Sequence, residues 1–271
     1  MAGRHLLFVG WFIWTLFGVE SPAKAQDVQA EWLGVKVLER RPGIPLKVGK
    51  RVVGKMSDLG PTPLVIESQG DWLRVGTDAH SGWVRQHDVT PIDQAPEYFS
   101  RVIKSDPKRG WAYNLRGIAR QEQGDFDGAL KDYSVAVRLN PRDAAAYNNR
   151  AWLLATCPDS AHRNSALALA SARQACKLTN WKQPIFVDTL AAACAAEGDF
   201  KSAAKWQAIA MKQLARDEDF QREARERLEM YAAGSGYPSV ETDAIAASDE
   251  PVVETARRAP SGNRPASRRR R

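Results

Sequence analysis

The chain has 271 residues, of which 44% are hydrophobic, and a formal net charge of +7. This length accommodates two small domains with tails, and the hydrophobic content is that of a globular protein. The charge does not indicate a nucleic-acid-binding domain, because seven arginines and no acid follow Glu254, which leaves the rest of the chain formally neutral. We therefore expect no specific nucleic-acid partner.

Residues 1–25 have the pattern of a secretory signal peptide. A basic start at Arg4 precedes an apolar run from Leu6 to Val19, and small residues stand at Ala23 and Ala25. The apolar run is short for a membrane span, which needs about 20 residues. We expect cleavage after Ala25 and export to the periplasm or cell envelope; the alternative is an uncleaved N-terminal membrane anchor.

Residues 31–93 alternate short β-rich runs with turns of Gly, Pro and Asp, which is the spacing of a small β-barrel. The stretch GDWLRVG, followed by GWVRQHDV, resembles the paired central strands of a bacterial Src-homology-3-like domain. In that fold one strand begins with Trp and the next with Gly-Trp-Val. The resemblance implies that Trp72, Val75, Trp83 and Val84 alternate between core and surface.

A motif then occurs twice, as GDFDGALKDYSVAV from Gly124 and GDFKSAAKWQAIAM from Gly198. Glycine, alanine and an aromatic residue form turns and fill space, so the motif indicates a structural repeat and not catalysis. Aligned on Pro141, the first copy resembles the 34-residue tetratricopeptide repeat. The matching positions are Gly117, Gly124, Asp125, Phe126, Ala129, Tyr133 and Ala136.

The resemblance covers residues 95–232 and implies about three antiparallel helix pairs in a superhelical stack, closed by a polar-faced capping helix. The middle pair has a loop five residues longer than the norm. We expect Gly124 to end the first helix of its pair, Asp125 to cap the second, and Gly117 with Ala129 to let the two approach closely. The predicted fold class is therefore multidomain α and β, with the barrel followed by an all-α stack of helix pairs.

Tetratricopeptide stacks present residues of the first helix of each pair along a concave groove, where they bind protein or peptide. The groove positions carried over by resemblance are Trp111, Asn114, Ile118, Gln121, Asn148, Trp152, Ile185 and Asp188. Asn is unfavourable inside helices, so Asn114 and Asn148 are candidates to bind a ligand's backbone; the alternative is that they are merely solvated. The clamp of the chaperone-tail subfamily is not supported. Of its positions only Asn149 fits, since Ile118, Ile185 and Thr189 occupy three others.

We predict no enzyme, no cofactor and no metal site. The stretch GKRVVGKM from Gly49 has phosphate-loop spacing, but Met56 replaces the magnesium-binding Ser or Thr, which favours a barrel strand. The four histidines lack the paired spacing of metal ligands. Among the three cysteines, a disulfide between Cys157 and Cys194 is the single pairing considered.

Two functions remain open. The first is a scaffold that binds protein or peptide partners in the groove. The second is a cell-envelope module whose barrel binds peptidoglycan or a wall peptide through Trp32 or Trp83; the alternative for both side chains is a place in the core. Residues 233–271 are predicted to be a disordered basic tail, either solubilising or in contact with anionic polymers or a membrane surface.

Overall fold

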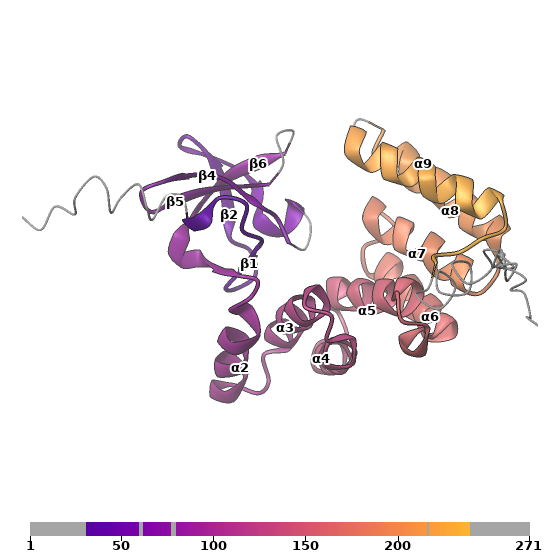
Figure 1. Ribbon diagram of the computed structural model, residues 1–271, viewed down its shortest axis with the longest axis horizontal. Coiled ribbons are helices and arrows are strands. Elements are labelled where there is room, and N and C mark those ends of the chain that lie inside the picture. Colours follow the sequence, from indigo (N-terminus) through magenta and orange to yellow (C-terminus); the bar gives the residue numbers. More distant parts are fainter. Residues whose placement is uncertain (1–30, 60–61, 77–79, 216, 239–271) are drawn as a thin grey trace, which may run out of the picture.

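The computed structural model describes residues 31–59, 62–76, 80–215 and 217–238 (Figure 1). An antiparallel β unit comes first, and eight described helices follow it in an arc. The predicted fold class is thus confirmed in its two parts. The proposed signal peptide and the arginine-rich end of the chain lie outside the described residues.

The β unit is an open sheet and not the closed barrel that the sequence predicts. Its five-stranded sheet has the order β3-β2-β6-β5-β4, and β1 pairs with β7 in a separate ribbon. The strands are β1 (Val37–Glu39), β2 (Pro45–Val48), β3 (Arg51–Lys55), β4 (Val65–Gln69), β5 (Trp72–Gly76), β6 (Ser81–Arg85) and β7 (Val89–Pro91). Within the described residues β3 is an edge, where Val52 and Val53 are 62% and 54% exposed. Backbone hydrogen bonds join residues next to β1 to β4, from the N–H of Gly34 to the carbonyl of Val65 and from the N–H of Val65 to the carbonyl of Val35. Among the described strands β3 pairs only with β2, so the sheet does not close.

The core of the β unit is aliphatic; Trp32 packs against it, whereas Trp72 and Trp83 lie outside it. Val75 and Val84 are buried, whereas Trp72 and Trp83 are half-buried on neighbouring strands. The guanidinium of Arg85 lies 4.1 Å from the ring centroid of Trp72. The predicted alternation is therefore present, with valine inside and tryptophan outside. The phosphate-loop-like stretch forms the turn before β3 and β3 itself, as the strand interpretation predicts.

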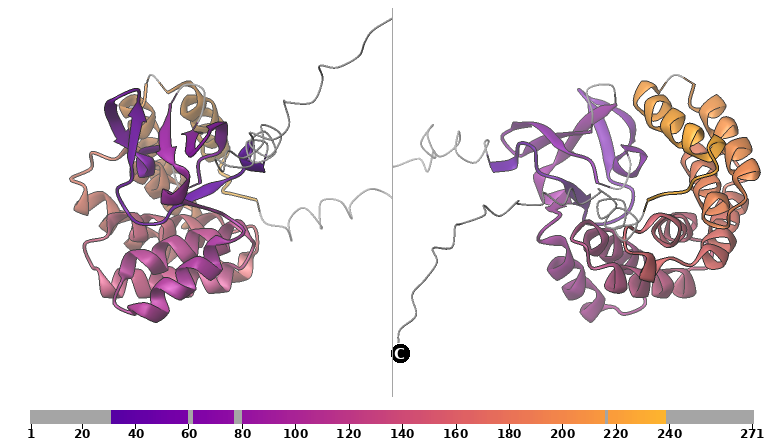
Figure 2. Two further views of the ribbon diagram at one scale, coloured as in Figure 1. Left: turned by 90° about the vertical axis from the view of Figure 1, so that its left-hand side faces the viewer. Right: turned by 45° about the vertical axis from the view of Figure 1, so that its right-hand side comes forward.

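Three helix pairs follow, and Figures 1 and 2 show them winding side by side into the arc. They are α3 (Gly110–Glu122) with α4 (Phe126–Leu139), α5 (Ala144–Thr156) with α6 (Ser165–Leu178), and α7 (Pro184–Ala196) with α8 (Phe200–Gln213). The helix α2 (Ala95–Ser105) packs on α3, and α9 (Glu218–Ala232) packs on α8. Among the described residues, no helix is long and apolar enough to cross a membrane.

The repeated Gly-Asp-Phe triplet is the turn inside a pair. Gly124 and Gly198 have φ values of 79° and 80°, which a residue with a Cβ rarely adopts. The carboxylate of Asp125 then accepts a hydrogen bond from the N–H of Gly128 at 2.9 Å and caps α4. Asp199 caps α8 in the same way, accepting from the N–H of Ser202. In both copies of the motif, therefore, the glycine ends the first helix and the aspartate caps the N-terminus of the second.

Small residues set the distance between the helices of the first pair. A Cβ on Gly117 would stand 2.6 Å from the ring of Tyr133, so only glycine lets the ring lie across α3. Ala129 is fully buried, and the Tyr133 hydroxyl donates a hydrogen bond to the side chain of Gln121 at 3.0 Å. The predicted close approach of α3 and α4 is present.

The β unit and the arc share a hydrophobic cluster. Leu38 of β1 is buried in the same cluster as Phe99 of α2, and the side-chain amide of Gln123 donates to the carbonyl oxygens of Ile92 and Asp93. The Lys36 ammonium also pairs with the carboxylate of Glu122. These contacts fix the direction in which the arc leaves the β unit.

The three cysteines are buried and free, so the disulfide considered from the sequence does not form. Cys157 lies in the cluster around Phe99, whereas Cys176 and Cys194 lie in the cluster that fills the second half of the arc. Cys157, directly after α5, and Cys194, in α7, therefore lie in different parts of the core.

Candidate functional site

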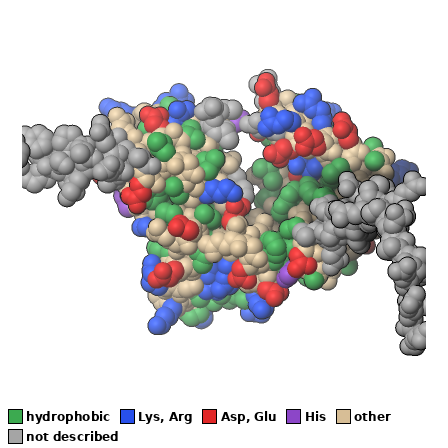
Figure 3. All heavy atoms as spheres, viewed as in Figure 1, with side chains coloured by type: hydrophobic (Ala, Val, Ile, Leu, Met, Phe, Trp, Pro, Cys, Tyr) green, Lys and Arg blue, Asp and Glu red, His purple; other side chains and the backbone are tan. Residues whose placement is uncertain are grey.

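A hollow lies on the inner side of the arc. Figure 3 shows it between the β unit and α9, with hydrophobic side chains gathered below α9 and charged side chains over α9 itself. The first helices of the pairs, α3, α5 and α7, carry the residues that the resemblance assigned to a groove. The structure places these residues at very different depths.

In α3 the predicted groove residues mostly serve the fold. Trp111 is half-buried and lies edge-on to Phe99, with ring centroids 6.5 Å apart. Ile118 is buried in the same cluster. Asn114 is buried as well, and its Oδ1 accepts a hydrogen bond from Nδ2 of Asn149 at 3.0 Å, which ties α3 to α5. Of this set, part of Trp111 remains available to a ligand, as does part of Gln121, although the side-chain carbonyl of Gln121 already accepts from Tyr133.

Asp188 in α7 is 4% exposed and belongs to a buried polar cluster. Its Oδ1 accepts hydrogen bonds from Nε2 of Gln207 at 2.6 Å and from Nε of Arg227 at 3.1 Å. Burial raises the pKa of the Asp188 carboxyl above its ordinary value, and the guanidinium of Arg227 opposes this shift. The carboxylate thus joins α7 to α8 and α9. Ile185, one turn earlier, is 48% exposed.

Asn148 and Trp152 of α5 are the predicted groove residues that could contact a ligand, Asn148 through a free hydrogen-bond acceptor and Trp152 through its ring. The Oδ1 atom of Asn148 is buried and accepts no hydrogen bond from any described residue. Trp152 is half-buried, and its ring lies edge-on to Tyr237, with centroids 5.6 Å apart and planes at 77°. This contact brings to α5 a part of the chain that the sequence assigned to the tail.

The segment Gly234–Pro238 crosses the inner side of the arc after α9 ends, as Figure 2 shows. It has no regular secondary structure, and Arg163 holds its end. One guanidinium nitrogen of Arg163 donates to the carbonyl of Tyr237 at 2.9 Å, and another donates to the carbonyl of Pro238. The third, Nε, donates to the carbonyl of Cys157 at 2.6 Å and anchors the guanidinium.

The sequence patterns predicted neither Arg163 nor Tyr237 as a site residue. Arg163 stands in the loop between α5 and α6, so the extra residues of the middle repeat supply the guanidinium. Tyr237 is a lone aromatic residue in a stretch otherwise poor in them, which was a usable signal. The structure thus brings Trp152 together with two residues outside the predicted set, and it leaves Trp111 elsewhere on the arc.

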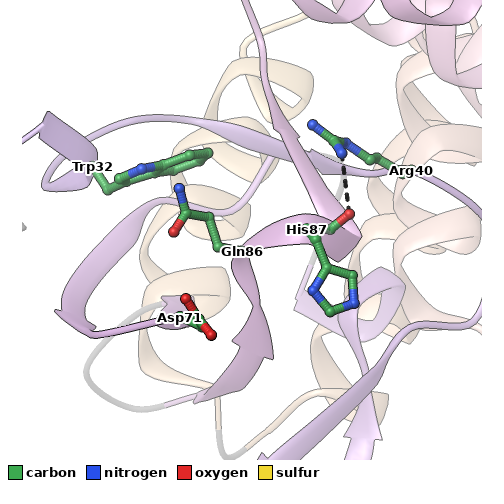
Figure 4. Close-up of a pocket in the computed structure, with 5 residues that line it drawn as sticks. All are labelled: Trp32, Arg40, Asp71, Gln86 and His87. Carbon is green, nitrogen blue, oxygen red and sulfur yellow. Dashed lines mark hydrogen bonds between the residues drawn. The ribbon is translucent and has the colours of Figure 1, made fainter. Parts of the chain in front are cut away.

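The β unit carries a second candidate site, a pocket of about 330 Å³. Figure 4 shows the five lining side chains, which are Trp32, Arg40, Asp71, Gln86 and His87. Arg40 donates to the carbonyl of His87 at 3.2 Å, while its buried Nε has no hydrogen-bond partner among the described residues. An aromatic plane beside an unpaired N–H donor suits a small polar ligand. Trp83, the other tryptophan predicted for this role, does not line the pocket.

Among the described residues, no group of three or more His, Cys, Asp or Glu side chains could hold a metal ion. All three thiols have raised pKa values because they are buried, so none is an activated nucleophile. Both candidate sites offer contacts suited to binding.

Comparison with known proteins locates a repeat in the first half of the arc. Residues 119–156 match the family described as TPR repeat. A stretch of 50 residues, 18% of this chain, is 42% identical to a Tetratricopeptide repeat protein 36 homolog of Nematostella vectensis and spans 28% of that relative.

Among solved structures, a thermophilic TPR protein of Thermus thermophilus is similar, with a TM-score of 0.41 and 21% identity. That alignment covers 53% of this chain and 72% of the other. The first TPR of Spaghetti (RPAP3) bound to an HSP90 peptide aligns with a TM-score of 0.39 and 19% identity, over 47% of this chain and 96% of the other. The family match and the chain's own helix pairs agree that residues 119–156 form part of a tetratricopeptide-type repeat.

Proposed function

We propose that the chain is an exported, non-enzymatic scaffold that binds a peptide segment of a partner protein on the inner face of its arc. The supporting observation is that this face already holds a non-helical segment, Gly234–Pro238, through Trp152 and Arg163. A surface that binds one backbone through an aromatic ring and a guanidinium suits others of similar shape.

Two further features support a peptide ligand. TPR repeats in general mediate protein or peptide binding, and residues 119–156 match that family. The buried, unpaired Oδ1 of Asn148 lies one helical turn before Trp152 on α5. An unsatisfied buried acceptor is unfavourable, and a backbone N–H of a bound segment would satisfy it.

The experiment is a pull-down from envelope extract with the full chain and with Asn148→Ala combined with Trp152→Ala. We expect the double variant to lose the captured partner while its helical melting curve stays close to that of the wild type. Trp181→Ala is the matched control, because Trp181 lies in the loop between α6 and α7, is 37% exposed and stacks on Trp206 of α8. Capture undiminished in the double variant would exclude this site, and equal loss in the control would show that the effect is not specific.

A second candidate function follows from the pocket of the β unit. An envelope ligand such as peptidoglycan or a wall peptide would stack on Trp32 and accept hydrogen bonds from the unpaired Nε of Arg40. Sedimentation with purified cell wall tests this, and Trp32→Ala should abolish it. Trp83→Ala is the control, since that side chain is half-buried outside the pocket.

Export remains part of the proposal and rests on the sequence of residues 1–25. Fractionation of cells that express the full chain tests it. A protein shortened by the signal and recovered in the periplasm supports export, whereas an unshortened protein in the membrane fraction supports the uncleaved anchor. An unshortened protein in the cytosol would contradict both.

A further inference from the structure

We propose that Trp152 and Arg163 form a recognition site for a segment in which an aromatic residue is followed by proline. In this structure the chain's own Tyr237 and Pro238 occupy that site, so a partner segment must displace them. The inference rests on the proposed peptide-binding function and adds to it the chemistry of the ligand and the identity of its competitor.

The aromatic position is selected by packing. The Tyr237 ring meets Trp152 edge-on, a favoured arrangement for two aromatic rings. The Tyr237 hydroxyl is buried without a hydrogen-bond partner among the described residues, and burial raises its pKa. The hydroxyl interacts electrostatically with Arg227 and Tyr231, whereas the contact with Trp152 is made by the ring. Phenylalanine should be accepted at least as well as tyrosine.

The position after the aromatic residue, occupied here by Pro238, is bound through its backbone carbonyl. Arg163 donates to the carbonyls of Tyr237 and Pro238, while its Nε is fixed by the carbonyl of Cys157. Proline has a restricted φ and no N–H, so it presents its carbonyl at a small entropic cost and leaves no donor unsatisfied. These two properties make proline a suitable residue after the aromatic one.

The site depends on the extra residues of the middle repeat. The loop between Thr156 and Ser165 contains a short helical turn, Ser160–His162, and places Arg163 beside the end of α5. The carboxylate of Asp159 caps that turn by accepting from the N–H of Ala161 at 2.9 Å. A loop of ordinary length would lack this guanidinium, so the insertion that interrupts the repeat supplies half of the site.

A short linker joins the occupying segment to the end of α9, where the N–H and the hydroxyl of Ser235 donate to the carbonyl of Met230. Gly234, Ser235 and Gly236 join α9 to Tyr237, and Gly234 has a φ of 72°, which ends the helix. Short flexible linkers hold a ligand at an effective concentration on the order of millimolar. A free peptide with the same contacts will therefore bind the wild type weakly and a variant with an emptied site more strongly.

The test uses the full chain and a fluorescent peptide with the sequence of residues 234–240, GSGYPSV, observed by anisotropy. We expect Tyr237→Ala to bind this peptide about tenfold more tightly than the wild type does, because the tethered competitor is weakened. Adding Trp152→Ala or Arg163→Ala to Tyr237→Ala should remove that gain. A peptide with Phe at the tyrosine position should bind as well as the original, and one with Ala should not bind.

Two outcomes overturn the inference. If Tyr237→Ala binds the peptide no better than the wild type, then Tyr237 is only a core residue, whatever happens to the melting midpoint. If the gain survives Trp152→Ala and Arg163→Ala, the peptide binds elsewhere. Partner capture in the pull-down is a separate measurement. If the wild type still captures a partner and the variant with Asn148→Ala and Trp152→Ala does not, the proposed function stands even when this inference fails.

Discussion

Asp188 and Arg227 form a buried ion pair that joins α7 to α9, with 3.1 Å between the carboxylate Oδ1 and a terminal nitrogen of the guanidinium. Replacing Asp188 with Ala leaves Arg227 buried without its charge partner. Breaking such a pair costs about 3–5 kcal/mol of the free energy of unfolding. We expect Asp188→Ala to shift the urea midpoint accordingly, with the α9 end of the stack loosened.

The control for that prediction is Glu223→Ala, because Glu223 contacts the same guanidinium at 3.4 Å but its side chain is 62% exposed. Its removal should change stability by less than about 1 kcal/mol. A normal midpoint for Asp188→Ala together with lost partner capture would mean that Asp188 faces the ligand, as the repeat resemblance implies.

The tight interface between α3 and α4 predicts that a larger side chain there destabilises the protein. Ala129→Leu should overpack α4 against α3 and cost about 1–3 kcal/mol, because Ala129 is fully buried. Ala170→Leu, on the exposed face of α6, is the matched substitution and should leave the midpoint nearly unchanged. Thermal melts followed by circular dichroism measure both. Equal midpoints for the two variants would contradict the register of the pair.

The buried thiols predict an alkaline limit to stability. Burial raises the pKa of Cys176 from 9.0 to about 12, so the unfolded chain ionises this thiol before the folded chain does. Stability from this group is complete below pH 9.0 and is lost as the pH rises towards 12, by up to about 1.4 kcal/mol per pH unit. Urea unfolding between about pH 8 and 11 should show a smaller slope of stability against pH for Cys176→Ala than for the wild type. Identical slopes would show that the thiol ionises freely in the folded state.

The junction between the β unit and the arc predicts coupled unfolding. Leu38→Ala removes a β1 side chain that is 1% exposed and lies in the cluster with Phe99 of α2, which should cost about 2–5 kcal/mol. Both the helical far-ultraviolet signal and the near-ultraviolet signal should shift to a lower midpoint. Leu33→Ala, at a position 53% exposed, is the control. A shift confined to one signal would mean that the two units unfold independently.

The helix pairs could be predicted from the sequence because their signals are local. Gly124 and Asp125 end α3 and begin α4 within a few residues. Gly117 of α3 is needed because the ring of Tyr133, in the next helix, lies against it. Which of the predicted groove residues are exposed could not be predicted in the same way. Asp188 is removed from solvent by Arg227, which stands 39 residues later and belongs to a capping helix with no place in the repeat pattern.

Two features of the structure could not be predicted from the sequence, for related reasons: the contacts of Gly234–Pro238 and the open edge of the sheet. Composition identifies Gly234–Pro238 as tail, yet its contacts depend on Arg163, in a loop that departs from the repeat. Strand patterns likewise predicted the β-structure correctly but a closed barrel wrongly, since closure depends on whether β3 pairs with a second strand besides β2. In each case the missing information lay in a distant partner.

The open edge at β3 bears on how the protein behaves in concentrated solution. Unpaired strand edges with exposed valines tend to associate with one another, and positive charges along an edge oppose this. Lys50, Arg51 and Lys55 supply such charges beside Val52 and Val53. Their mutual repulsion acts over about 10 Å at 0.1 M salt and only about 3 Å at 1 M. Raising the ionic strength therefore weakens the barrier to self-association, and low-salt buffers favour a dispersed protein.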